Sequence, residues 1–389
     1  MESQQIVTET VSFGVGCMSL LPVDLIFSVE NPEPSQWAKT LRTALETIPS
    51  ISNISVNIPA VNHPGPSIEQ IRSKYLLLDG RHTNLSLADL NGPSNGTVRF
   101  EITIPERMHS LAKFSSAKSL APYERFEVTT NYRYYGPVTF VRAVGATAPL
   151  PRPSAIVILV REFLRQQLAK TDTDVRLLSI GPSPFHADFH ANFEHATTAD
   201  PLETLTYLWE RLRGYDRVSY AFKIPPESAV DDAYREVIDT LSDPLSAYYY
   251  CVTLENNRGN DVNQINAEAD DLIDLHQSTG ALNWLKRTFR SSSKARDLQI
   301  SISSARRRDA DRARIFDDVL DGQSSETIPE LFQKISGAFV SDPPKDFALA
   351  NDIATTLENG RRVQFEVATL AAATMTGGLG GALVTILAR

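Results

Sequence analysis

VATLAAATMTGGLGGALVTILA, at Val367–Ala388, is the stretch around which this sequence is most readily organised, because its 22 residues carry no charge. At about 1.5 Å per residue, a helix of this length covers the ~30 Å hydrocarbon core of a bilayer. Only eight of its residues are bulky, and the others are six Ala, four Thr and four Gly. The length favours a transmembrane helix, and the small residues leave open a helix buried in a soluble protein core.

Small residues recur at every fourth position of this segment, as expected for a surface along which helices approach closely. The stripe consists of Thr369, Ala373, Gly377, Gly381 and Thr385. Because it contains a Gly-x-x-x-Gly pair, we expect the helix to associate with copies of itself. The chain is therefore predicted to form a homo-oligomer, and an oligomeric pore or effector would fit this prediction.

The composition of the whole chain is that of a folded, water-soluble body. Of its 389 residues 42% are hydrophobic and 22% charged, and the formal net charge of −9 argues against nucleic-acid binding overall. Cys17 and Cys251 stand far apart without metal-ligand spacing, which is typical of free thiols in a reducing compartment. No signal peptide is apparent at the N-terminus.

Arg361 and Arg362 precede the apolar segment and favour a cytoplasmic location for the body before it. The expectation is thus a single-pass, tail-anchored membrane protein, with a cytoplasmic protein as the alternative.

Hydrophobic patterning predicts an α+β fold, with a mixed or antiparallel sheet, packed helices and a C-terminal apolar helix. We expect a β-rich part at 1–150, an α+β continuation at 151–259, a helical region with a basic stretch at 260–360, and the apolar helix at 361–389. Alternating or β-branched segments predict strands at Val23–Glu30, Ile51–Ile58, Val98–Ile104, Arg125–Tyr134, Val138–Val144, Val175–Ile180, Phe185–His195 and Val218–Ile224. Helical periodicity predicts helices at Ser35–Thr47, Ser154–Lys170, Leu202–Arg213, Pro226–Leu241 and Val262–Arg290, with further helices beyond.

FHADFHANFEH, at Phe185–His195, is the sequence most suggestive of chemistry. In a strand its Phe and Ala residues would share one face and its polar residues the other. His186, Asp188 and His190 could then bind a divalent metal ion, or act as a catalytic base with an orienting acid. The alternative is that they form the solvent face of an amphipathic strand.

A basic run extends from Lys286 to Arg314, with ten Lys or Arg against three Asp. Arg306, Arg307 and Arg308 could bind an anionic lipid surface. The alternative is a solvated helix face that pairs with acidic residues such as Asp271.

Three functions remain open at this level. The first is a tail-anchored sensor or effector whose cytosolic body binds a partner. The second is a metal-dependent hydrolase that uses His186, Asp188 and His190. The third is a soluble, oligomeric interaction protein whose C-terminal helix is buried.

Overall fold

The structure is a computed structural model, and it forms two compact units. The first comprises Met1–Thr253 and Leu320–Phe339, and the second Leu254–Val319 and Val340–Arg389. The residues that the structure describes are 8–22, 34–59, 95–112, 122–133, 135–146, 148–173, 175–180, 183–195, 203–225, 227–277, 281–322, 329–339 and 344–359.

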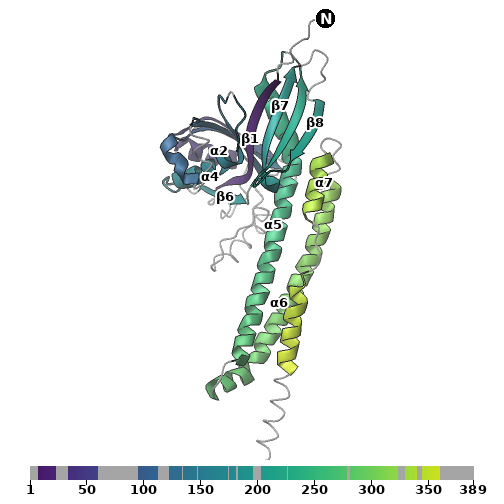
Figure 1. Ribbon diagram of the computed structural model, residues 1–389. Coiled ribbons are helices and arrows are strands. Elements are labelled where there is room, and N and C mark those ends of the chain that lie inside the picture. The colour runs from purple at the N-terminus through teal and green to yellow at the C-terminus, as the bar shows by residue number, and fades with distance from the viewer. Residues whose placement is uncertain are drawn as a thin grey trace, which may run out of the picture. The chain divides into compact units, whose positions relative to one another are not determined.

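A nine-stranded sheet forms the centre of the first unit (Figure 1). Its strands are β1 (Thr8–Pro22), β2 (Ile51–Asn57), β3 (Gly96–Thr103), β4 (Arg125–Arg133), β5 (Gly136–Ala143), β6 (Val175–Ile180), β7 (Ala187–His195), β8 (Glu203–Glu210) and β9 (Asp216–Ile224). The order is β2-β3-β4-β5-β1-β7-β9-β8, and β6 also pairs with β1. Neighbouring strands are antiparallel except β7 and β9, which are parallel. The expected α+β class with a mixed sheet is therefore confirmed.

The long strand β1 connects the two halves of this sheet. It pairs with β5 on one edge, and Thr139 of β5 also bonds both the N–H and the C=O of Met18. Strands β7 and β6 follow one another along the opposite edge, where Phe13 pairs with Phe189 and Cys17 with Ile180. Between these pairs β1 advances by four residues and the opposite strand by nine, so the β6–β7 connection accommodates five additional residues.

Helices cover both faces of the sheet. Helices α2 (Pro34–Glu46) and α4 (Ser154–Leu168) share one apolar core with the sheet. The N-terminal part of α5 (Val230–Gln277), together with α7 (Pro329–Ala338), shares a second core with β1, β7 and β9. Alternation along β1 explains this division, because Phe13 and Val15 belong to the second core whereas Gly14 lies against α4.

The absence of a side chain at Gly14 allows α4 to lie close to the sheet. A Cβ atom at this position would lie 2.4 Å from the carbonyl oxygen of Pro153 and 2.5 Å from Val157 Cγ2. Gly16 is similar, because its Cβ would lie 2.5 Å from Val157 Cγ1. Both positions therefore require glycine at this helix–strand distance.

The second unit is a bundle of long helices, formed by the rest of α5, by α6 (Ala281–Gly322) and by a helix at 346–359 (Figure 1). Its core residues alternate between spacings of three and four, which is the heptad pattern of a coiled coil. They are Ile265, Ala269, Leu272, Ala295, Leu298, Ile302, Ala305, Phe347, Ala350 and Ala354. An ionic layer adjoins this core, where Arg258 Nε lies 3.0 Å from Asp309 and Arg312 pairs with Asp261.

Several predicted elements differ from the structure. The helix expected at Leu202–Arg213 is wrong, because β8 occupies these residues: Tyr207 and Trp209 pack against the core while Leu208 between them is 52% exposed. This alternation is that of a strand. Strand β1 was not predicted, and the strand expected at Val23–Glu30 lies outside the described residues. Helix α5 continues through Pro244 to Gln277.

The prediction of a tail-anchored, single-pass membrane protein must be corrected. Within the described part of the chain, no helix combines the length and the apolar character needed to cross a membrane. Helices α5 and α6 are long, with 48 and 42 residues, but both carry many charged side chains. The segment Val367–Ala388, with its stripe of small residues, lies outside the described residues.

Candidate functional site

The predicted two-faced strand is present as β7. Ala187, Phe189, Ala191 and Phe193 are all fully buried in the core shared with α5, as the alternation predicted. The polar face, however, is also covered: Asp188 and His190 are each only 5% exposed. These two residues are therefore not on a solvent face.

Asp188 holds the N-terminus of α4. Its Oδ1 accepts a hydrogen bond from the Ser154 backbone N–H at 2.9 Å. Pro153, at the N-cap position, has no side-chain hydrogen bond to the helix, so Asp188 supplies the acceptor that an N-cap residue would provide. Burial raises the pKa of Asp188, although the hydrogen bonds from Ser154 oppose this shift.

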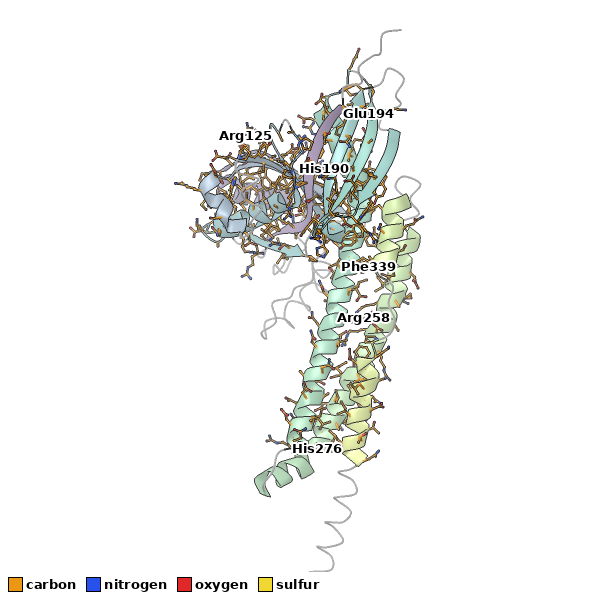
Figure 2. The ribbon with its side chains drawn as sticks, in the orientation of Figure 1. Arg125, His190, Glu194, Arg258, His276 and Phe339 are labelled. Carbon is orange, nitrogen blue, oxygen red and sulfur yellow. The ribbon has the colours of Figure 1, made fainter. Side chains whose placement is uncertain are left out.

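His190 lies two residues further along β7, on the same face as Asp188 because side chains alternate along a strand. Figure 2 labels its position. Its Nδ1 is 2.9 Å from Ser12 Oγ of β1, and Ser12 Oγ accepts the Leu150 backbone N–H at 3.0 Å. Burial, together with the positive charge of Arg217, lowers the pKa of His190 to about 4. The imidazole is thus neutral near pH 7. We call Ser12, Asp188 and His190 the clasp, because they fix the backbone leading into α4 to the sheet.

His186 is separated from the other two predicted ligands. It belongs to the 3₁₀ turn η4 (Pro184–His186) and not to β7, and its φ is +53°. Its ring meets the ring of Tyr215 edge-on, with 5.8 Å between the centroids. Among the described residues, no three His, Cys, Asp or Glu side chains are grouped so that they could hold a metal ion. The clasp consequently offers a structural explanation for Asp188 and His190.

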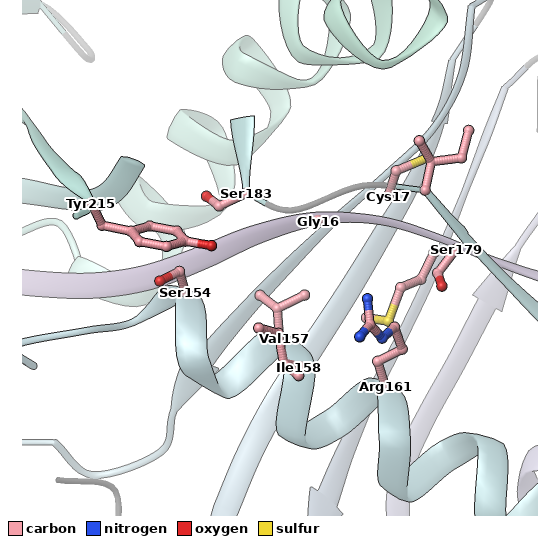
Figure 3. Close-up of a pocket in the computed structure, with 11 residues that line it drawn as sticks. Gly16, Cys17, Ser154, Val157, Ile158, Arg161, Ser179, Ser183 and Tyr215 are labelled. Atoms are coloured by element: carbon pink, nitrogen blue, oxygen red, sulfur yellow. The ribbon is translucent and has the colours of Figure 1, made fainter. Parts of the chain in front are cut away.

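A cavity of about 300 Å³ opens beside the clasp, where the β6–β7 connection passes α4 (Figure 3). Ser154, Ser183 and Tyr215 line one end of it, and Arg161 and Ser179 line the other. Apolar side chains of α4 lie between these ends, at Val157 and Ile158. The cavity therefore has two polar ends joined by an apolar floor.

Cys17 contributes to the wall of this cavity but does not have the environment of a nucleophile. It is 2% exposed, and its Sγ donates to the carbonyl oxygen of Pro137 at 3.1 Å. Burial raises its pKa, which keeps the sulfur protonated. Cys17 is therefore a structural thiol.

In the second unit, part of the basic run pairs with acidic residues of α5. Arg308 Nη2 lies 2.8 Å from Asp261 Oδ1, and Lys294 Nζ lies 2.9 Å from Asp271 Oδ2. Arg306 and Arg307 are exposed. Binding of an anionic surface by Arg306, Arg307 and Arg308 stays a prediction, and for Arg308 it would compete with Asp261.

Comparisons of the chain with protein-family models, with curated proteins and with solved structures give no match. The site must therefore be interpreted from its own geometry. Sequence reasoning missed Ser12, Arg161 and Tyr215, which come from three separate elements or loops. The Ser-Phe-Gly-Val-Gly alternation at Ser12–Gly16 was an available signal, because it marks a strand with one small-residue face.

Proposed function

We propose that this protein is a binding protein without catalytic activity, and that the cavity between α4 and the β6–β7 connection is its ligand site. The observation that carries the proposal is the separation of the clasp from the cavity wall. Ser12 and His190, which are paired as a nucleophile and its base would be, do not line the cavity. The residues that do line it can donate hydrogen bonds, supply positive charge or make apolar contacts.

The clasp is also poorly suited to proton transfer near pH 7. A general base works best when its pKa is close to the ambient pH, whereas the pKa of His190 is lowered to about 4. Ser12 is 7% exposed, and its Oγ already accepts the Leu150 N–H. These side chains stabilise the position of α4, which in turn forms the floor of the cavity.

The size of the cavity supports a small ligand. A volume of about 300 Å³ is at the lower end of the range for ligand sites in proteins. Three serines and a tyrosine provide hydroxyl groups around it, and Gly16 brings the β1 backbone to its wall. Such a site selects ligands through a few polar contacts around an apolar centre.

A fragment screen by ligand-observed NMR tests this proposal. The variant Ile158→Phe places a larger side chain in the cavity and reduces its free volume, and Leu208→Phe is the matched control because Leu208 is 52% exposed on β8 and does not line the cavity. Fragments that bind the wild type should be lost with Ile158→Phe and retained with Leu208→Phe. If bound fragments are equally retained by both variants, the cavity is not the ligand site.

A second candidate function is self-association through the helical unit, which keeps the predicted homo-oligomer as a proposal. Ile300 and Leu349 are 55% and 61% exposed in this unit, on the outer side of their heptads. Charge complementarity favours a second copy as the partner, because exposed Arg306 on α6 could meet exposed Asp270 on α5 of the other chain.

Light scattering coupled to size-exclusion chromatography tests this second candidate. The wild type should run as a dimer or larger oligomer, and Ile300→Glu combined with Leu349→Glu should run as a monomer with unchanged helix content. A dissociation constant on the order of 100 μM marks the weakest self-association of interest. If the wild type is monomeric at about that concentration, this second candidate is excluded.

A further inference from the structure

The two ends of the cavity differ in charge. At the end that Arg161 and Ser179 line, Arg161 Nε lies 3.0 Å from Glu162 Oε1, and Arg165 Nη1 lies 2.9 Å from the same oxygen. One carboxylate therefore serves two guanidinium groups, and this end carries an excess of one positive charge. Only Arg161 of the two arginines lines the cavity.

Arg161 has capacity for a further acceptor. Within the described part of the chain its hydrogen bond runs from Nε to Glu162, which leaves the terminal nitrogens for a ligand. The guanidinium group lies beside the cavity near Ser179, whose hydroxyl can also donate (Figure 3). A planar guanidinium next to a hydroxyl group is an arrangement that favours a carboxylate or phosphate oxygen.

The residues that line the opposite end are polar and uncharged, and the opposite charges of Asp188 and Arg152, which both act on Tyr215, lie outside the lining. Tyr215 directs its hydroxyl toward the cavity between Ser154 and Ser183 (Figure 3). Burial is the main cause that raises the pKa of Tyr215, so its hydroxyl remains a donor near pH 7. Ser183 Oγ donates to the carbonyl oxygen of Ala187 at 2.5 Å, which leaves its lone pairs to accept from a ligand.

From this arrangement we infer that the ligand is a small organic anion, with its carboxylate or phosphate group at Arg161 and Ser179 and a neutral polar group at Tyr215. Val157 and Ile158 contact its apolar centre. The inference rests on the proposed ligand-binding function and adds the chemical class of the ligand. The shared chemistry is a terminal oxyanion, and the choice between carboxylate and phosphate is an outcome of the test.

Isothermal titration calorimetry with four probes tests the inference: 4-hydroxybenzoate, phenyl phosphate, inorganic phosphate and the neutral 4-hydroxybenzamide. We expect at least one of the two aromatic anions to bind the wild type about tenfold or more tightly than the amide. Inorganic phosphate should bind more weakly than phenyl phosphate, because it lacks the apolar part. A preference between the two aromatic anions identifies the oxyanion.

The variants Arg161→Gln and Arg235→Gln form a matched pair, because each arginine pairs with a carboxylate of its own helix but only Arg161 lines the cavity. Arg161→Gln should remove the preference for the anion, and Arg235→Gln should keep it. Arg161→Lys should retain part of it, since lysine keeps the charge but loses the planar fork. Circular dichroism checks that each variant is folded.

The two levels of the proposal fail in different ways. If 4-hydroxybenzamide binds as tightly as the anions and Ile158→Phe abolishes this binding, the ligand site stands and the anionic class is wrong. The inference is also overturned if no anionic probe binds the wild type at about 10 mM, since a dissociation constant above roughly this value is too weak for a ligand site. Anion binding that persists in Arg161→Gln excludes Arg161 as its partner.

Discussion

Acidification should destabilise the first unit through His190. The pKa of His190 is lowered from 6.5 to about 4 in the folded protein, chiefly by burial. Between these two values the unfolded chain binds a proton at this residue and the folded chain does not. The stability that the neutral imidazole contributes is therefore present above pH 6.5 and is lost as the pH falls toward 4.

The magnitude follows from the two pKa values. With an unfolded value of 6.5 and a folded value of about 4, the linkage relation gives a loss of about 2 kcal/mol between pH 7 and pH 5, and about 3 kcal/mol at pH 4. His190→Gln cannot take up a proton and should lack this component. The charged and titratable groups near His190 include Arg217 and Asp188, and they are unchanged in both proteins.

Urea denaturation followed by tryptophan fluorescence measures this difference. The chain has three tryptophans, of which Trp37 and Trp209 belong to the first unit and Trp284 to the second. Introducing Trp284→Phe into both proteins makes the signal report on the first unit alone. The free energy of unfolding is then compared for His190 and His190→Gln at pH 7, 6, 5 and 4.

The result that refutes this reasoning is a pair of parallel curves. If the difference in unfolding free energy between the two proteins changes by less than about 0.5 kcal/mol from pH 7 to pH 5, His190 does not have a depressed pKa. In that case the imidazole is accessible to water, and the clasp does not exclude it from solvent.

Three further predictions concern packing and buried charge. Asp188→Asn keeps an acceptor for the Ser154 N–H and avoids the ionised carboxylate that burial disfavours, so the first unit should be at least as stable as in the wild type at pH 7. Asp188→Ala removes the acceptor and should lower the free energy of unfolding by about 1–3 kcal/mol in the same urea assay. Gly14→Ala should lower the free energy of unfolding, measured by thermal unfolding, by roughly 1–3 kcal/mol, because its Cβ would lie 2.4 Å from the carbonyl oxygen of Pro153. In the second unit, Asp309→Leu should lower the free energy of unfolding by about 1–3 kcal/mol, because it leaves the charge of Arg258 without this partner. Adding Arg258→Leu removes that charge and should recover most of the loss, as measured by helix melting with circular dichroism.

Each of these predictions has a control. For Asp188, the wild type should lose stability relative to Asp188→Asn as the pH rises from 3.8 through the raised folded pKa, and the opposite trend would contradict the assignment. For Gly14 the control is Gly259→Ala, where a Cβ meets nothing within 4 Å in a helix, and which should be neutral or stabilising by up to about 1 kcal/mol. Equal losses at the two glycines would contradict the packing argument. For Asp309, a double variant less stable than the single one would show that the ionic layer is net favourable.

The sequence predicted those elements whose pattern is local. Phe189 and Phe193 were assigned to the core because alternation alone decides which face of a strand is apolar. Helix α4 was expected from its apolar run, and it begins and ends close to the predicted residues. Strand β8 is not evident from the sequence because Leu208 is exposed between two packed aromatic residues. Three bulky residues in a row hide the alternation of a strand and resemble the apolar face of a helix.

The role of the polar residues could not be predicted, since it depends on contacts between distant segments. Asp188 and Ser154 are 34 residues apart, and His190 and Ser12 are separated by 178. A row of polar side chains on a strand is usually solvated, and here the N-terminus of α4 covers it. Gly14 permits that approach, so the burial of β7 is determined by a residue of β1.

The helical unit shows the same dependence on partners. Alternating spacings of three and four, from Ile265 to Leu272 and from Ala295 to Ala305, would have indicated a coiled coil. Half of the core residues of this unit are alanine, however, and α6 carries many charged residues, so the apolar pattern is weak in the sequence. Arg308 and Lys294 have acidic partners on α5, which is an arrangement that charge counting along one helix does not reveal.

The cavity arises from the same long-range geometry, and this explains why no motif marks it. Its wall forms where the strand opposite β1 gains five residues between Ile180 and Phe189. This interruption places Ser183 beside α4, while the parallel strand β9 begins directly after Tyr215 and positions that residue at the same place. Arg161 then reaches the cavity because α4 lies against Gly16. Removing the five residues would make β6 and β7 one continuous strand, and the cavity and its proposed ligand would be lost together.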